Sequence, residues 1–167
     1  MTSNEAKRTL VLLRHAKAAN PEGVADAARP LTPRGHADAA AAGAWLANRG
    51  YLPDLVICSP SRRTRETWHG VALALSKGPE VTYPEEAYGA GAGELLDLVS
   101  AVDDATGTVL VIGHNPAMSS LSGLLDPDHA DPDGLRTCGL AVHTVAVAWA
   151  RLGPDLGGLA ETHTARG

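Results

Sequence analysis

The stretch "TLVLLRHAKAA", residues 9–19, is an apolar run that stops abruptly at Arg14, His15 and Lys17. Continuous Val and Leu without polar alternation are typical of a strand buried on both faces, as in a parallel sheet. A second stretch, "TVLVIGHNPAM" at 108–118, has the same form and ends on His114. The sequence therefore predicts two buried strands, far apart in the chain, that each present a histidine at the carboxyl end.

Amphipathic segments alternate with short apolar runs along the rest of the chain. Helices are expected over 33–49, 61–76, 93–102 and 115–125. Further strands are expected within 53–59, 80–83 and 139–150, the last of them antiparallel or at an edge. Thr32 suits the N-cap of the first helix, Pro33 its first position and Gly50 its end. This alternation predicts a three-layer α/β/α sandwich with a mainly parallel sheet.

The length and composition fit one domain over residues 1–167, with 152–167 expected as a loose tail. A net charge of -5 argues against nucleic-acid binding, which needs a basic surface. No apolar stretch reaches the ~18 residues of a membrane span, and "MTSNEAKR" at 1–8 lacks the apolar core of a signal peptide. Cys58 and Cys138 lack metal-type spacing and suit buried thiols in a reducing compartment. We therefore expect a cytoplasmic protein.

Polar residues follow three of the predicted strands. They are Arg14 and His15, the segment 59–63, and His114 with Asn115. In open α/β sheets the functional crevice lies beyond the carboxyl ends of the strands, so these groups should share one rim. Arginine forks suit phosphate oxygens, and histidine is a neutral nucleophile near pH 7. Two arginines and two histidines could then support phosphoryl transfer without a metal.

Four segments in order carry a family resemblance: "LRHAK" (13–17), "RPLTPRG" (29–35), "SPSRRTRET" (59–67) and "VIGHNP" (111–116). Together they resemble the histidine phosphatase superfamily, with its phosphoglycerate mutase-like fold. The short chain is similar to the compact SixA-type protein phosphohistidine phosphatases of that superfamily.

The resemblance implies a covalent phosphohistidine on His15, with Arg14, Arg63 and His114 gripping the transferred group. Arg63 fills the family's arginine position four residues after Ser59, whereas Arg62 and Arg65 suit surface or rim charges. Lys17 and Asn115 are further substrate-binding candidates, and phosphate or sulfate is expected to occupy the pocket. The resemblance implies no metal and no cofactor.

The sequence departs from the family pattern at three points. Ala16 replaces the usual glycine after the nucleophile, and Lys17 stands at a position that is often acidic in mutases. The third departure bears on the substrate: the middle of the chain lacks a recognisable acidic motif, although Glu85 and Glu86 are candidates for a general acid. An alcohol leaves poorly without a placed acid, which is worth ~10²–10⁴-fold, whereas imidazole is readily protonated. The expected substrate is therefore a phosphohistidine on another protein or an activated ester. A broad small-molecule phosphomonoesterase, a phosphomutase and an inactive phospho-ligand binding module stay open as alternatives.

Other features receive structural interpretations. Ser59 is expected to act as a turn residue, the loop 126–134 as a solvated acidic loop, and the small residues of 39–45 as packing against the sheet. The remaining histidines, expected on surfaces or helix faces, are His36, His69, His129, His143 and His163. None of them pairs at metal-ligand spacing.

Overall fold

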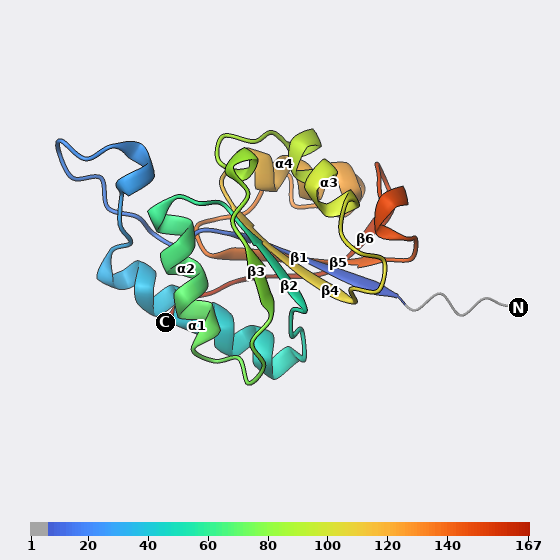
Figure 1. The fold of residues 1–167 in the computed structure, drawn as a ribbon, viewed down its shortest axis with the longest axis horizontal. Helices are drawn as coiled ribbons and strands as arrows, with labels where there is room; N and C mark the ends of the chain where they lie inside the picture. The colour runs from blue at the N-terminus through green and yellow to red at the C-terminus, as the bar shows by residue number, and fades with distance from the viewer. Residues whose placement is uncertain (1–6) are drawn as a thin grey trace, which may run out of the picture.

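The computed structural model describes residues 7–167 as a six-stranded sheet covered by helices on both faces (Figure 1). The strands are β1 (Arg8–Arg14), β2 (Leu55–Cys58), β3 (Glu80–Thr82), β4 (Thr108–Gly113), β5 (Gly139–Val145) and β6 (Gly157–Thr164). The helices are α1 (Pro33–Arg49), α2 (Arg62–Ala72), α3 (Ala92–Ser100) and α4 (Ala117–Leu125), with short 3-10 turns η1 (Asp26–Ala28), η2 (Glu85–Ala87) and η3 (Trp149–Arg151). Most of the polar N-terminal segment, residues 1–6, lies outside the described residues.

The sheet order places the carboxyl ends of three strands side by side. The order is β3-β2-β4-β1-β5-β6, in which β3, β2, β4 and β1 are parallel and β5 and β6 are antiparallel. Arg14 at the end of β1 pairs with Gly113 at the end of β4, and Cys58 of β2 pairs with Ile112. The residues that follow these strands therefore start from one edge, as the sequence predicted.

Two hydrophobic cores lie on opposite faces of the sheet. Leu10 and Leu12 of β1 belong to the core beneath α3 and α4, whereas Val11 and Leu13 belong to the core beneath α1 and α2. This division follows from the alternation of side chains along a strand. Figure 1 shows the same two helical layers on either side of the sheet. The three-layer prediction is confirmed.

Helix α1 has the predicted ends, and its small residues contact α2 in addition to packing against the sheet as predicted. The Thr32 hydroxyl accepts a hydrogen bond from the Gly35 amide at 3.0 Å, and Gly50 closes the helix at a φ of 77°. A Cβ at Gly43 would lie 2.3 Å from the Val71 carbonyl oxygen of α2. The small residues of 39–45 therefore permit close approach to α2 as well as packing against the sheet.

The C-terminal segment is an ordered strand, which corrects the expected loose tail. β6 pairs antiparallel with β5 along its length, with one irregularity between Val142 and His143. As a result β5 lies inside the sheet and β6 forms its edge. Taken alone, the sequence of β6 is polar and contains glycines, which is typical of a loop. The segment forms a strand because it makes hydrogen bonds with β5.

Two smaller expectations were wrong, and a third holds only in part. His143 is fully buried in β5, where its ring bonds the Ser122 hydroxyl and the Gly157 carbonyl oxygen, each at 2.8 Å. The acidic loop 126–134 is mostly exposed, as expected, but Asp126 at its start is buried and accepts a hydrogen bond from the Leu159 amide at 2.7 Å. Helix α2 ends at Ala72 rather than at residue 76, which leaves Leu73 exposed.

Cys58 and Cys138 are free and buried, as predicted, and desolvation raises the pKa of each thiol to about 12. Within residues 7–167, no helix combines the length and the apolar character needed to cross a bilayer. The same residues contain no group of three or more His, Cys, Asp or Glu side chains placed to hold a metal ion.

Candidate active site

A hollow of about 290 Å³ opens at the carboxyl ends of β1 and β4. Its lining residues are Arg14, His15, Lys17, Ala18, Arg29, Arg63, His114, Asn115 and Thr137. The rings of His15 and His114 meet edge to face, with their centroids 5.4 Å apart. All six residues predicted for the site therefore line one hollow, although they come from segments far apart in the chain.

The imidazole of His15 is fixed by its own turn. Its Nδ1 lies 2.8 Å from the Ala16 carbonyl oxygen. A carbonyl can only accept, so Nδ1 carries the proton and Nε2 keeps the lone pair. The Ala16 amide donates to the Thr67 hydroxyl of α2 at 3.0 Å, which anchors this turn. Desolvation, followed by the nearby Arg63 and Arg14 charges, lowers the pKa of His15 to about 4, so the ring is neutral at pH 7.

The imidazole of His114 is held by a residue for which the sequence predicted only a turn. Its Nε2 lies 2.7 Å from the Ser59 hydroxyl, and Ser59 is fully buried at the end of β2. Desolvation and the Arg63 charge lower the pKa of His114 to about 4. In the neutral tautomer with a proton on Nδ1, Nε2 accepts from the Ser59 hydroxyl and Nδ1 remains a donor.

Unpartnered buried nitrogens concentrate at this site. Within residues 7–167, four buried side-chain polar atoms have no hydrogen-bond partner, and three of them are Arg14 Nε, Arg63 Nε and His114 Nδ1. Buried polar groups are nearly always satisfied, so such atoms call for an explanation. Three nitrogens that can donate around one hollow suit an anion with several acceptor oxygens.

Arg63 is oriented by a residue that the sequence analysis missed. Its Nη1 donates to the Asp26 carbonyl oxygen at 2.7 Å, and its Nη2 donates to the Asp26 carboxylate at 3.0 Å. The Tyr88 hydroxyl also donates to this carboxylate, and the Tyr88 ring meets His114 edge to face at 5.7 Å. The hydrogen bonds from Tyr88 and Arg63 lower the pKa of Asp26 to about 2, so it is ionised at pH 7.

The remaining lining residues differ in how they are held. Arg14 Nη1 donates to the Leu135 carbonyl oxygen at 3.1 Å, and Arg29 Nε donates to the Ala19 carbonyl oxygen at 3.0 Å. Asn115 lines the hollow, but its amide nitrogen bonds the Leu135 carbonyl oxygen and its amide oxygen accepts from Ser119. Asn115 thus braces the loop before β5. Arg29 belongs to the "RPLTPRG" motif, and that motif was the available signal for it.

The two glutamates suggested as general acids do not line the hollow. Glu85 and Glu86 are exposed on η2. Asp26 is the carboxylate that reaches Arg63, and its low pKa makes it a poor proton donor.

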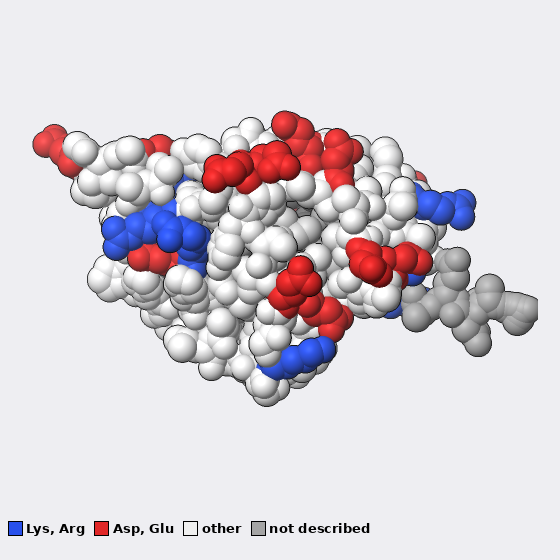
Figure 2. Space-filling model, viewed as in Figure 1, with Lys and Arg blue, Asp and Glu red and all other residues white. Residues whose placement is uncertain are grey.

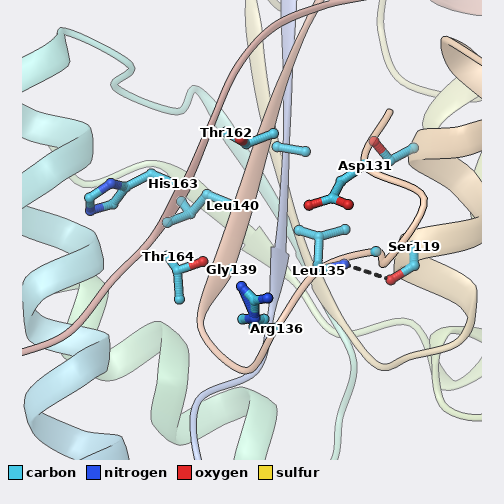
Figure 3. Close-up of a pocket in the computed structure, with 12 residues that line it drawn as sticks. Ser119, Asp131, Leu135, Arg136, Gly139, Leu140, Thr162, His163 and Thr164 are labelled. Carbon is cyan, nitrogen blue, oxygen red and sulfur yellow. Dashed lines mark hydrogen bonds between the residues drawn. The ribbon is translucent and has the colours of Figure 1, made fainter. Parts of the chain in front are cut away.

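A separate, smaller cavity is lined by the loop that carries Leu135 together with α4, β5 and β6 (Figure 3). Its volume of about 50 Å³ has room for a few water molecules. Leu135 lines it, with the Leu135 amide donating to the Ser119 hydroxyl at 2.9 Å. Because it is small and lacks both paired histidines, this cavity is not the candidate active site.

An α/β domain with a mainly parallel sheet that gathers two imidazoles and several guanidinium groups at its strand ends can bind and transfer phosphoryl groups. The family model of the histidine phosphatase superfamily (branch 1) matches residues 10–87. An uncharacterized protein of Mycobacterium tuberculosis is 37% identical over 164 residues, which cover 92% of this chain and 100% of that protein.

Solved structures give the same result over nearly the whole chain. The putative phosphohistidine phosphatase SixA of Nakamurella multipartitia is 36% identical with a TM-score of 0.82, covering 96% of this chain and 97% of that one. The putative SixA of Agrobacterium tumefaciens is 30% identical with a TM-score of 0.81, covering 93% and 97%. The chain belongs to the histidine phosphatase superfamily, is of the SixA type, and is a phosphatase.

Proposed function

We propose that this protein hydrolyses phosphohistidine carried on another protein, with His15 as the nucleophile. The observation that carries the proposal is the fixed tautomer of His15. The Ala16 carbonyl oxygen holds the proton on Nδ1, and the Nε2 lone pair is left for attack within the hollow that His114 also lines. A pKa of about 4 keeps that lone pair available at neutral pH.

The reaction proceeds in two displacements at phosphorus. His15 Nε2 attacks the phosphoryl group, the bond to the substrate imidazole breaks, and the departing nitrogen keeps the electron pair and takes a proton from solvent. Water then attacks the phosphorylated His15, which releases phosphate and restores the free imidazole. Arg14, Arg63 and His114 donate hydrogen bonds to the equatorial oxygens, where charge is neutralised in both steps.

The nature of the proton donors near the hollow supports an imidazole leaving group. Asp26 is ionised at neutral pH, and the Tyr88 hydroxyl is engaged with it. Glu85 and Glu86 do not line the hollow, so we assign them no role there. A departing alkoxide needs a placed acid, whereas imidazole is protonated readily near neutral pH.

Hydrolysis of small phosphomonoesters is the second candidate, and activated esters with good leaving groups are its best substrates. The cytoplasmic location and the absence of a nucleic-acid partner stay predictions of the sequence.

The test compares a phosphohistidine peptide with p-nitrophenyl phosphate, each with and without EDTA. We expect preference for the peptide, no effect of EDTA, and an acid-labile phosphoryl group trapped on the enzyme. The His15→Ala variant should abolish turnover and trapping, and Arg63→Ala should lower kcat/KM by about 10²–10³-fold.

Arg62→Ala is the matched control, because Arg62 is the exposed neighbour that pairs with Glu66. It should retain most activity. Full turnover by His15→Ala would refute the nucleophile, and faster ester than peptide hydrolysis would favour the second candidate. A wild-type protein inactive on both substrates would refute hydrolysis as the function of this site.

A further inference from the structure

A second hollow adjoins the candidate active site. It has a volume of about 440 Å³, and its lining residues are Lys17, Thr32, Arg34, Asp38, Thr137 and Arg166. Lys17 and Thr137 line both hollows, so the two share a wall. A substrate that places its phosphoryl group beside His15 can therefore extend its flanking atoms into the second hollow.

The second hollow is positively charged in a protein of net charge -5. It has three cations, Lys17, Arg34 and Arg166, against one carboxylate, that of the buried Asp38. Asp38 lies 3.8 Å from Arg34 Nε and 3.5 Å from Arg166 Nη1, so a single negative charge is shared between two guanidinium groups. The groove therefore keeps a net positive charge.

Cations are also concentrated over the two hollows together. Six of the 14 Lys and Arg residues of the chain line them, whereas Asp38 is the one acidic lining residue. On the face drawn in Figure 2, the largest group of basic side chains lies toward the end that carries the start of α2, smaller basic groups lie elsewhere, and acidic side chains are scattered, some of them beside the largest basic group. Such asymmetry on an acidic protein focuses the field and attracts an anionic ligand to one place.

The backbone that carries these cations is fixed. The Lys17 carbonyl oxygen accepts from the Thr32 amide at 2.9 Å. A Cβ at Gly35 would lie 2.1 Å from that same oxygen, so glycine lets the strand end sit against the first turn of α1. Arg166 Nη1 donates to the Thr137 carbonyl oxygen at 2.9 Å. The groove is thus a formed surface rather than a set of independent side chains.

We propose that the second hollow is a subsite for an acidic peptide segment that flanks the phosphohistidine of a partner protein. This inference rests on the proposed function and names the partner's chemistry. The two hollows differ in a way that fits this division of roles. Unpartnered buried nitrogens line the first hollow and suit a desolvated phosphoryl group. The second presents exposed cationic heads, which suit solvated carboxylates spaced along a chain.

The test measures the binding of unphosphorylated peptides, with fluorescence anisotropy as the readout. One labelled peptide carries histidine flanked by glutamates, and its partner carries glutamines at the same positions. Wild-type protein should bind the acidic peptide about tenfold more tightly than the neutral one, with a preference that weakens as salt is raised. Arg34→Gln should reduce that ratio and Arg34→Glu should bring it to about one. Arg34 is exposed in the first turn of α1, where glutamine and glutamate suit the helix N-terminus.

Arg151→Glu is the control with the same change of net charge. Arg151 is exposed on η3, which follows β5 in the chain. The last residue of β5, Val145, pairs with Arg8, and Arg8 lies at the end of β1 opposite the site. This variant should keep the wild-type ratio.

Equal affinity for the two peptides, or a ratio unchanged in Arg34→Glu, would overturn the subsite. Besides the two peptides, the binding measurement includes a small bisphosphate as a third ligand. If it binds through Arg34 while the acidic peptide does not, the peptide assignment is wrong. Failure to hydrolyse a phosphohistidine peptide would count against the proposed function alone, since binding is measured without turnover.

Discussion

At the scale of single residues, the site uses side chains of two kinds: those that directly follow buried strands, and those that loops bring to Arg63. The sequence could place Arg14, His15 and His114, because apolar runs end at them and parallel strands share a carboxyl edge. Asp26 and Tyr88 could not be placed. They lie 62 positions apart in loops without periodicity, and their contact exists only because the two loops meet over Arg63.

Ser59 allows a prediction about how His114 is oriented. Ser59→Ala removes the hydroxyl that bonds His114 Nε2, and a net hydrogen bond is worth about 0.5–1.5 kcal/mol. We expect kcat to fall by about three- to tenfold, because the imidazole loses its preferred tautomer and orientation. Steady-state kinetics measures this effect, and NMR of the His114 ring reports the change of tautomer.

Ser61→Ala is the control for this prediction, since the Ser61 hydroxyl caps α2 and does not contact His114. It should lower stability by about 1 kcal/mol with little change in kcat. If both variants lose activity in proportion to their stability, Ser59 acts through folding alone.

At the scale of secondary-structure elements, the sequence could predict the strands that are buried along their whole length. β1, β2 and β4 are buried on both faces, so their composition is sufficient to identify them. β6 is buried only at its first residue, is otherwise partly buried or exposed, and begins with two glycines, so its sequence resembles a loose tail. Its strand conformation depends on pairing with β5, and single-sequence patterns do not contain that information. The close contact of α1 with α2 was likewise hidden, because small residues suit a sheet face equally well.

That helix contact gives a prediction about stability. In Gly43→Ala the new methyl group would lie 2.3 Å from the Val71 carbonyl oxygen and 2.8 Å from the Val71 Cα, and backbone atoms cannot rotate away. We expect a loss of about 1–3 kcal/mol from overpacking, which exceeds the gain in helix propensity. Urea unfolding measures it.

Gly123→Ala is the matched substitution in α4, where nothing lies within 4 Å of the added Cβ. It should stabilise the protein by about 0.5–1 kcal/mol. Equal changes for the two variants would mean that α1 and α2 are not in close contact.

At the scale of the whole molecule, neutral histidine side chains lie both in the interior of the sheet and at the rim that forms the active site. The pKa values of His15 and His114 are lowered to about 4, and burial also lowers the pKa of His143. The same burial that prepares a nucleophile therefore makes the folded state sensitive to acid. The unfolded chain, with ordinary histidine pKa values near 6.5, takes up protons that the folded chain does not.

The last prediction concerns stability as a function of pH. A depressed histidine pKa contributes stability that is fully present above the unfolded value and is lost as pH falls toward the folded value. The free energy of unfolding should thus decrease between about pH 6.5 and pH 4, by up to about 3 kcal/mol for each of His15 and His114, because one pKa unit is worth about 1.4 kcal/mol. The His15→Asn and His114→Asn double variant should flatten this part of the curve, as measured by urea unfolding at each pH.

His129 supplies a control of opposite sign. The Asp126 carboxylate beside it raises its pKa, so its contribution is present below pH 6.5 and is lost as pH rises through the raised value. His129→Asn should therefore lower stability at acidic pH without flattening the loss that His15 and His114 produce. Inorganic phosphate should partly restore stability near pH 5 in the wild type, because a bound anion favours the protonated rings, and should do so less in the double variant. A wild-type curve that stays level between pH 6.5 and pH 4 would mean that the two rings are not held neutral by the fold, and the proposed nucleophile would lose its physical basis.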